Sequence, residues 1–254
     1  MGSSQKNQTP TVSIIIPALN EAHSIGATLK AVVRLSPGTE VVVVDGGSVD
    51  QTCEIAKACG AHVIASERGR GVQMHRGAAV AKGDVFWFLH ADTIVPTESF
   101  DLIAEALRDE RVVAGNFNIH FDAPGAAARF MTWLYPQLRR LGLCYGDSAI
   151  FVRREAYERS GGFNPLPIFE DLELLRRLKR MGRFVHLSST VITSGRRFAG
   201  SRFIGTFIRW IALQLLYWLG VSPGRLGGWY APVRQSGKEL NMVLVRNKSN
   251  RADI

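Results

Sequence analysis

The chain has 254 residues, of which 46% are hydrophobic, and its 31 basic and 22 acidic residues give a formal net charge of +9. A chain of this length and apolar content can bury one large hydrophobic core, which excludes an intrinsically disordered protein. The positive charge favours an anionic partner: nucleotide phosphates, nucleic acid or an acidic membrane surface. The three cysteines show no CxxC spacing, which favours reduced thiols in the cytosol over disulfides or a zinc site.

The chain begins with a polar segment, residues 1–10, which lacks the apolar core of a secretory signal and which we expect to be a flexible tail. Residues 12–17 are apolar and predict a strand. After a short loop, apolar residues at helical spacing predict a helix that ends near Arg34. A strand followed by a helix is the first unit of an α/β fold.

Valines occupy positions 41–44 and predict a strand that is buried on both faces of a parallel sheet. Asp45 follows at the carboxyl end of this strand, where open α/β sheets bind their ligands. Gly46 and Gly47 permit a tight turn, and Ser48 is a candidate N-cap for the next helix. The alternative is that Asp45 and Ser48 only shape the turn.

A short strand at residues 61–65 and a helix that ends near residue 83 complete three βα units, which predict half of a doubly wound domain. The loop Gly69-x-Gly71 has Met74 in place of the third glycine of a dinucleotide-binding motif, so we reject that function. The start of this helix carries basic and amide side chains that either bind an anion or form a solvated basic face: Arg68, Arg70, Gln73 and Arg76.

The strand predicted at residues 84–89 ends on His90, Ala91 and Asp92. Two candidate metal ligands one residue apart can point into the same binding site at the carboxyl end of a strand. A hard divalent cation would accept the Asp92 carboxylate and fill its other positions with phosphate oxygens and water. Together with Asp45 at the end of another strand, these residues predict a nucleotide and metal site.

The middle of the chain is expected to add elements around this sheet. Residues 98–107 predict an amphipathic helix, and residues 112–121 predict a strand. Residues 126–142 are helical in composition but contain Pro136, so we expect an interrupted helix that covers one side of the sheet. Asp147 then precedes a short apolar strand.

Glu170 and Asp171 open an amphipathic helix. Acids in a first turn commonly serve the helix dipole. Here the pair follows a rigid Pro-x-Pro loop, and a carboxylate held at a buried helix start is a candidate general base. A further strand at residues 184–194 leads to the basic pair Arg196 and Arg197.

Residues 203–221 are the most apolar stretch of the chain. This stretch is barely long enough to span a membrane, and Arg209 lies near its middle. We expect a helix that lies on a membrane surface or in a subunit interface, with an ordinary core helix as the alternative. The tail from residue 235 is polar and basic.

Six short motifs occur in order along the chain: Ile-Ile-Ile-Pro-Ala-Leu-Asn-Glu at 14–21, Val-Asp-Gly-Gly-Ser-Val-Asp at 44–50, Leu-His-Ala-Asp at 89–92, Gly-Asp at 146–147, Gly-Gly-Phe at 161–163 and Glu-Asp at 170–171. As an ordered set, they resemble family 2 glycosyltransferases of the GT-A fold over about residues 11–200. The resemblance implies an α/β fold with an open, mostly parallel central sheet flanked by helices. The remaining segments would be an apolar helical appendage, residues 201–234, and a polar basic tail, residues 235–254.

The resemblance implies an inverting enzyme that moves a sugar from a nucleotide-diphosphate sugar to an acceptor hydroxyl, assisted by Mn²⁺ or Mg²⁺. Combined with the basic residues above, it gives this predicted nucleotide-sugar site: Pro17, Asn20, Glu21, Asp45, Gly46, Arg68, Arg70, Gln73, Arg76, Ala91, Asp147, Arg196 and Arg197.

The resemblance also assigns the metal and the base. The metal would bind at His90 and Asp92; His90 stands where the family has an aspartate, so Asp92 is the surer ligand. Asp171 matches the residue that deprotonates the acceptor, with Glu170 beside it.

Two other functions stay open at this point. A nucleotidyltransferase would carry a Gly-rich loop where this chain has Pro-Ala-Leu-Asn-Glu, and His90 keeps open a nucleotide-sugar-binding protein without catalysis. The expected partners are the sugar donor, a hydroxyl-bearing acceptor of lipid or glycan type, a membrane surface and a second copy of the chain, but not nucleic acid. We expect the protein in the cytoplasm, with a peripheral position at the inner face of the membrane left open.

Overall fold

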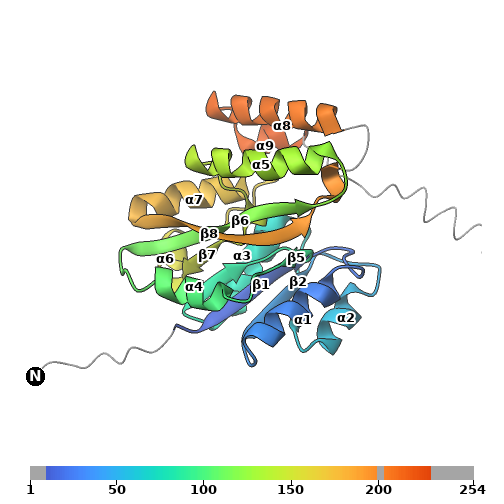
Figure 1. Ribbon diagram of the computed structural model, residues 1–254, viewed down its shortest axis with the longest axis vertical. Coiled ribbons are helices and arrows are strands. Elements are labelled where there is room, and N and C mark those ends of the chain that lie inside the picture. Colours follow the sequence, from blue (N-terminus) through green and yellow to red (C-terminus); the bar gives the residue numbers. More distant parts are fainter. Residues whose placement is uncertain (1–9, 199–202, 230–254) are drawn as a thin grey trace, which may run out of the picture.

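The structure, a computed structural model, describes residues 10–198 and 203–229, except for the side chain of Arg197. Within these residues eight strands form one mixed sheet, with helices on both of its faces (Figure 1). The strands are β1 Val12–Ala18, β2 Glu40–Asp45, β3 His62–Ala65, β4 Val85–Phe88, β5 Thr93–Ile94, β6 Val112–Asp122, β7 Phe151–Arg153 and β8 Arg183–Ser194. The α/β fold predicted from the sequence is confirmed.

The helices occupy the segments between these strands and the end of the described chain. They are α1 Ile25–Leu35, α2 Thr52–Ala58, α3 Arg70–Val80, α4 Ser99–Ala106, α5 Ala126–Arg140, α6 Arg154–Arg159, α7 Glu170–Met181, α8 Phe203–Trp218 and α9 Pro223–Gly227, with short 3₁₀ turns η1 Gly146–Ser148 and η2 Arg196–Phe198. None of the helices in the described part of the chain is long and apolar enough to cross a membrane.

The strand order is β3-β2-β1-β4-β7-β6-β8-β5, and its first four strands are parallel. Ile14 pairs with Val41 on one side and with Trp87 on the other, so β1, β2 and β4 run in the same direction. Their carboxyl ends therefore meet at one edge of the sheet, where the loops carrying the predicted site begin.

Two apolar layers cover the faces of the sheet. Alternate residues of β1 illustrate the division, because Ile14 packs in the cluster shared with α1, α2 and α4, whereas Ile15 packs in the cluster shared with α3, α6 and α7. Both side chains are fully buried. Full burial of one such side chain contributes about 1.5–3 kcal/mol to folding, so this double coverage explains why the valine run shows no polar alternation.

Helices α5 and α8 run side by side above strands β6 and β8 (Figure 1). Phe130 of α5 meets Phe207 of α8 edge to face, with ring centroids 5.6 Å apart. Trp210 of α8 meets Phe198 in the same way at 5.8 Å. Residues 203–218 of the predicted apolar stretch therefore form α8, which packs against α5 and η2.

The helix predicted around Pro136 is not interrupted, because α5 runs continuously from Ala126 to Arg140. Proline removes one helical hydrogen bond and crowds the preceding turn. The burial of Met131 and Tyr135 against the sheet offsets that cost.

The predicted N-cap at Ser48 is also wrong, because α2 begins at Thr52. The Ser48 hydroxyl instead accepts the backbone N–H of Asn20 at 2.9 Å. Gln51 occupies the position before the helix, and Asp50 accepts the backbone N–H of Thr52 at 3.1 Å.

The predicted division of the chain near residue 200 falls beside residues 199–202, which lie outside the described residues. The tails predicted before residue 10 and from residue 235 also lie outside them, so these boundaries stay predictions.

Candidate active site

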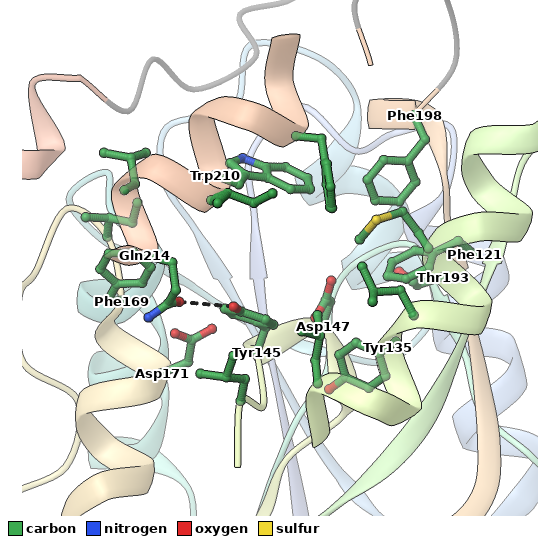
Figure 2. Close-up of a pocket in the computed structure, with 18 of the residues that line it drawn as sticks. Phe121, Tyr135, Tyr145, Asp147, Phe169, Asp171, Thr193, Phe198, Trp210 and Gln214 are labelled. Atoms are coloured by element: carbon green, nitrogen blue, oxygen red, sulfur yellow. Dashed lines mark hydrogen bonds between the residues drawn. The ribbon is translucent and has the colours of Figure 1, made fainter. Parts of the chain in front are cut away.

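A cavity of about 430 Å³ opens at the carboxyl edge of the sheet, between α5, α8 and the start of α7. Figure 2 shows the carboxylates of Asp171 and Asp147 at its base, with Tyr145 between them, and Trp210 on the opposite wall. His90 and Asp92 line the same cavity. The structure thus brings together the ends of β4 and β8, the η1 turn and α7.

Asp171 lies in the first turn of α7 and is 2% exposed. Its carboxylate accepts the backbone N–H groups of Gly146 at 2.6 Å and of Leu172 at 2.7 Å. Burial, followed by the neighbouring charge of Glu170, raises the pKa of Asp171 to about 7, against the lowering effects of Arg70 and the two backbone N–H groups. A carboxyl group with such a pKa can exchange a proton near neutral pH.

Glu170 is equally buried but faces away from the cavity. Its Oε1 atom lies 2.5 Å from Nε of Arg70, a residue from the start of α3. Adjacent residues of a helix point about 100° apart, so the two carboxylates acquire separate surroundings. Glu170 has a fixed cationic partner, whereas Asp171 meets the cavity.

Gly71, from the rejected dinucleotide motif, permits close packing of α3 against the start of α7. Gly71 lies where α3 crosses the loop before α7, and a Cβ atom there would come within 2.8 Å of the carbonyl oxygen of Asn164 and 3.1 Å of the Glu170 Cβ. The close approach that Gly71 permits brings Arg70 within reach of Glu170.

Arg196 joins two of the predicted site residues. Its Nη2 atom donates to Oε2 of Glu21 at 3.0 Å and to Oδ2 of Asp92 at 3.2 Å. Thr193 donates its hydroxyl to the other oxygen of Asp92 at 3.3 Å. One guanidinium group therefore forms ion pairs with both carboxylates, which come from the loops after β1 and β4.

Asp45 has a turn-shaping role in the structure. It is 8% exposed, and its carboxylate accepts the backbone N–H groups of Gly47 and Ser48, each at 3.0 Å to Oδ2. Asn20, with a φ of 56°, accepts the N–H of Val49 at 2.9 Å and ties the loop after β1 to the same turn. The loop with Asn20 and the turn after Asp45 are thus preformed at the ends of β1 and β2, and the contact of Pro17, Asn20 and Asp45 with a nucleotide stays a prediction.

The four polar residues predicted around the start of α3 have different surroundings, and only Arg70 lines the cavity. Gln73 is buried and donates its amide to the carbonyls of Ala18 and Val44, at 2.9 and 2.8 Å. Arg68 is exposed and donates to the Gly46 carbonyl at 3.3 Å, and Arg76 is exposed further along the helix. Anion binding by these residues therefore stays a prediction.

Two further predicted residues differ in position. Ala91 is buried, and its carbonyl accepts the Thr28 hydroxyl at 2.9 Å, which fixes the loop after β4 against α1. Asp147, in η1, lines the cavity (Figure 2). Arg197 falls in η2, and its side chain lies outside the described residues.

Several residues that line the cavity, most of them apolar, were not predicted from the sequence. Phe121, Tyr145, Phe198, Trp210 and Gln214 all line it (Figure 2). The spacing of Trp210, Leu213 and Gln214 places them on one side of a helix. Periodicity alone does not predict which part of the protein that side of the helix faces.

The predicted metal ligands His90 and Asp92 both line the cavity. Across residues 10–198 and 203–229, no group of three or more His, Cys, Asp or Glu side chains is arranged to hold a metal ion.

Comparisons with known proteins agree with this architecture. The model of glycosyl transferase family 2 matches residues 13–184. The glucosyl-3-phosphoglycerate synthase of Mycolicibacterium smegmatis is 35% identical over 101 residues, which are 35% of this chain and 33% of that protein. The probable glycosyltransferase YdaM of Bacillus subtilis is 27% identical over 213 residues, which are 73% of this chain and 50% of that protein. The matched segments thus span from a third to a half of these curated relatives.

Solved structures share the fold. The glucosyl-3-phosphoglycerate synthase of Mycobacterium tuberculosis, in complex with Mn²⁺, UDP and glucosyl-3-phosphoglycerate, has a TM-score of 0.62 at 23% identity, covering 84% of this chain and 81% of that chain. TarS of S. aureus, in complex with UDP-GlcNAc, has a TM-score of 0.61 at 19% identity, covering 76% and 60%. Because the family model matches well over half of the residues, this chain belongs to glycosyl transferase family 2.

Proposed function

We propose that this protein is an inverting glycosyltransferase that moves a sugar from a nucleotide-diphosphate sugar to an acceptor hydroxyl. One observation carries the proposal: the buried carboxyl group of Asp171, with its pKa raised to about 7, lies at the base of a cavity that also holds Asp92 and Arg70. A base and a cationic group at one site are what glycosyl transfer requires.

The donor we propose is a UDP-sugar. The related structures from M. tuberculosis and S. aureus contain UDP and UDP-GlcNAc, respectively. In this chain Pro17 in β1, Asn20 in the loop after β1 and Asp45 at the end of β2 would hold the nucleoside. The membership of family 2 removes the nucleotidyltransferase from the alternatives, and a binding protein without catalysis becomes an outcome of the test below.

In the proposed reaction, the Asp171 carboxylate accepts the proton of the acceptor hydroxyl. The acceptor oxygen then forms a bond to the anomeric carbon while the bond from that carbon to the diphosphate breaks, and the nucleoside diphosphate leaves with the bonding electrons. Attack from the face opposite the leaving group inverts the anomeric centre. The N–H groups of Gly146 and Leu172 fix the orientation of the carboxylate through this step.

The residues present fit a divalent cation. The Asp92 side chain is 20% exposed, beside His90 at the cavity, and one carboxylate with diphosphate oxygens and water is a common Mg²⁺ or Mn²⁺ site. Asp92 would hold the cation, with His90 as a second ligand. When bound, the cation would stabilise the negative charge of the departing diphosphate. Arg196 would add positive charge there, since it already contacts Asp92 and Glu21.

A donor screen tests the proposal. The purified protein is incubated with a panel of sugar nucleotides and hydroxyl-bearing acceptors, with and without Mn²⁺, and release of the nucleoside diphosphate is measured. We expect release from at least one donor and its loss in Asp171→Asn, while calorimetry shows that this variant still binds the donor. Donor binding without turnover in the wild type would instead identify a binding protein without catalysis.

The cytoplasmic location, the membrane surface and the second copy of the chain stay proposals as well. Exposed apolar residues on α8, among them Ile204 and Ile208, support a contact of that helix with a membrane or with another chain.

A further inference from the structure

The wall of the cavity opposite Asp171 is apolar and well packed. Phe198 is 5% exposed, and its ring meets Phe121 and Trp210 edge to face at 4.8 and 5.8 Å. Such packing marks a preformed wall, and its lining offers few groups that could hydrogen-bond a sugar acceptor.

One polar side chain of α8 lines the same cavity near Asp171. Gln214 of α8 is 7% exposed, and its Oε1 atom accepts the Tyr145 hydroxyl at 3.0 Å. Among the described residues its Nε2 group has no hydrogen-bond partner. Figure 2 shows Gln214 and Asp171 beside Tyr145 at the same end of the cavity. A buried amide donor without an acceptor destabilises a fold, so this group is suited to an oxygen atom of a ligand.

The apolar wall continues to the surface of the molecule. Ile211, Leu215 and Trp218 line the cavity and are 45%, 50% and 59% exposed. A chain-like ligand that is anchored at Asp171 could therefore extend along α8 and leave the cavity without crossing a polar barrier.

We propose that the acceptor is an amphiphile, a hydroxyl compound whose hydrocarbon or aromatic body occupies the wall between α5 and α8. Its hydroxyl reaches Asp171, and the Gln214 amide donates a hydrogen bond to an oxygen of its polar end. This inference rests on the proposed glycosyl transfer for its chemistry, but the binding that it describes can be measured without a donor.

Calorimetry with 1-O-alkylglycerols from ethyl to octyl tests the binding directly. Burial of one further methylene should strengthen binding about fourfold, until the chain reaches the surface. Affinity that is independent of chain length, or equal to that of glycerol, would overturn the proposal. Because no donor is present, this result is independent of whether the protein transfers a sugar.

Two exposed tryptophans provide a matched pair of variants. Trp218→Ser should weaken octylglycerol binding about tenfold, because it removes part of the wall. Trp133→Ser should not, because Trp133 is 64% exposed on α5 and does not line the cavity. Equal losses in the two variants would show adsorption to the surface and contradict the assignment.

Gln214→Leu separates the polar contact from the apolar wall. We expect about a tenfold weaker binding of octylglycerol and, in turnover, a raised acceptor KM with an unchanged affinity for the donor. Unchanged acceptor affinity would remove Gln214 from the site.

Whether the acceptor is a dissolved compound or a membrane lipid can be tested by supplying it in free solution or in vesicles. Transfer to octylglycerol in free solution identifies a dissolved acceptor, and transfer only to a long-chain alkylglycerol in vesicles identifies a membrane lipid; both results support the proposal. Transfer to glycerol or glucose with equal kcat/KM would overturn it.

Discussion

Two adjacent acids, Glu170 and Asp171, have opposite environments, and this contrast underlies the proposed chemistry. The sequence predicts that only one of them faces the site, because neighbours on a helix diverge by about 100°. It does not predict that Arg70, 100 residues earlier, neutralises Glu170. That pairing depends on the packing of α3 against α7, which local sequence patterns do not encode.

The burial of Asp171 should affect stability as well as catalysis. Its pKa is raised above the unfolded value of 3.8 to about 7, so the folded state binds the proton more tightly than the unfolded state. The free energy of unfolding should therefore fall as the pH rises from about 4 to 7. Denaturant titrations across this range should show a weaker fall in Asp171→Asn. An unchanged pH dependence in that variant would mean that other groups cause it.

Asp92 is the residue on which the metal assignment depends. Asp92→Ala removes a partly exposed carboxylate and no core volume, so the fold should persist while Mn²⁺ no longer strengthens nucleotide binding. Calorimetry with UDP, with and without Mn²⁺, measures this. His90→Asp serves as the control and should preserve the effect of Mn²⁺. If Mn²⁺ strengthens binding equally in Asp92→Ala, the ligand lies elsewhere.

At the scale of the elements, α3 fixes the ends of two strands. Gln73 donates to the carbonyls of Ala18, the last residue of β1, and of Val44, the next-to-last residue of β2. Sequence analysis predicted the strands and the helix, because their apolar patterns are strong, but it assigned Gln73 to anion binding. A side chain that bonds two backbone carbonyls leaves no periodic signal.

Gln73→Leu should therefore destabilise the protein. It removes both side-chain hydrogen bonds, to the carbonyls of Ala18 and Val44, which contribute about 0.5–1.5 kcal/mol each. Arg76→Leu, an exposed position on the same helix, should change the free energy of unfolding by less than about 0.5 kcal/mol. Denaturant midpoints of the two variants give the comparison, and similar small losses would show that Gln73 has no role in joining the strands.

At the scale of the whole molecule, the first half of the fold follows from the sequence more fully than the second. The parallel strands β1 to β4 alternate with helices, and each strand reads as an apolar run between loops. The cavity under α5 and α8 could not be predicted in this way, since Trp210 meets Phe198 and Phe130 meets Phe207 only after the chain has folded. Pro136 within α5 also misled the prediction, because tertiary packing overrides a local breaker.

The pH dependence of sugar transfer by the wild type and by Asp171→Asn tests the central claim most directly. A base with a pKa of about 7 is active when deprotonated, so kcat/KM should rise about tenfold per pH unit below pH 7 and level off above it. The variant should be about 10²–10⁴-fold slower, without this rise, at near-normal donor affinity. A variant that keeps the wild-type profile and rate with bound donor would contradict the assignment of Asp171 as the general base.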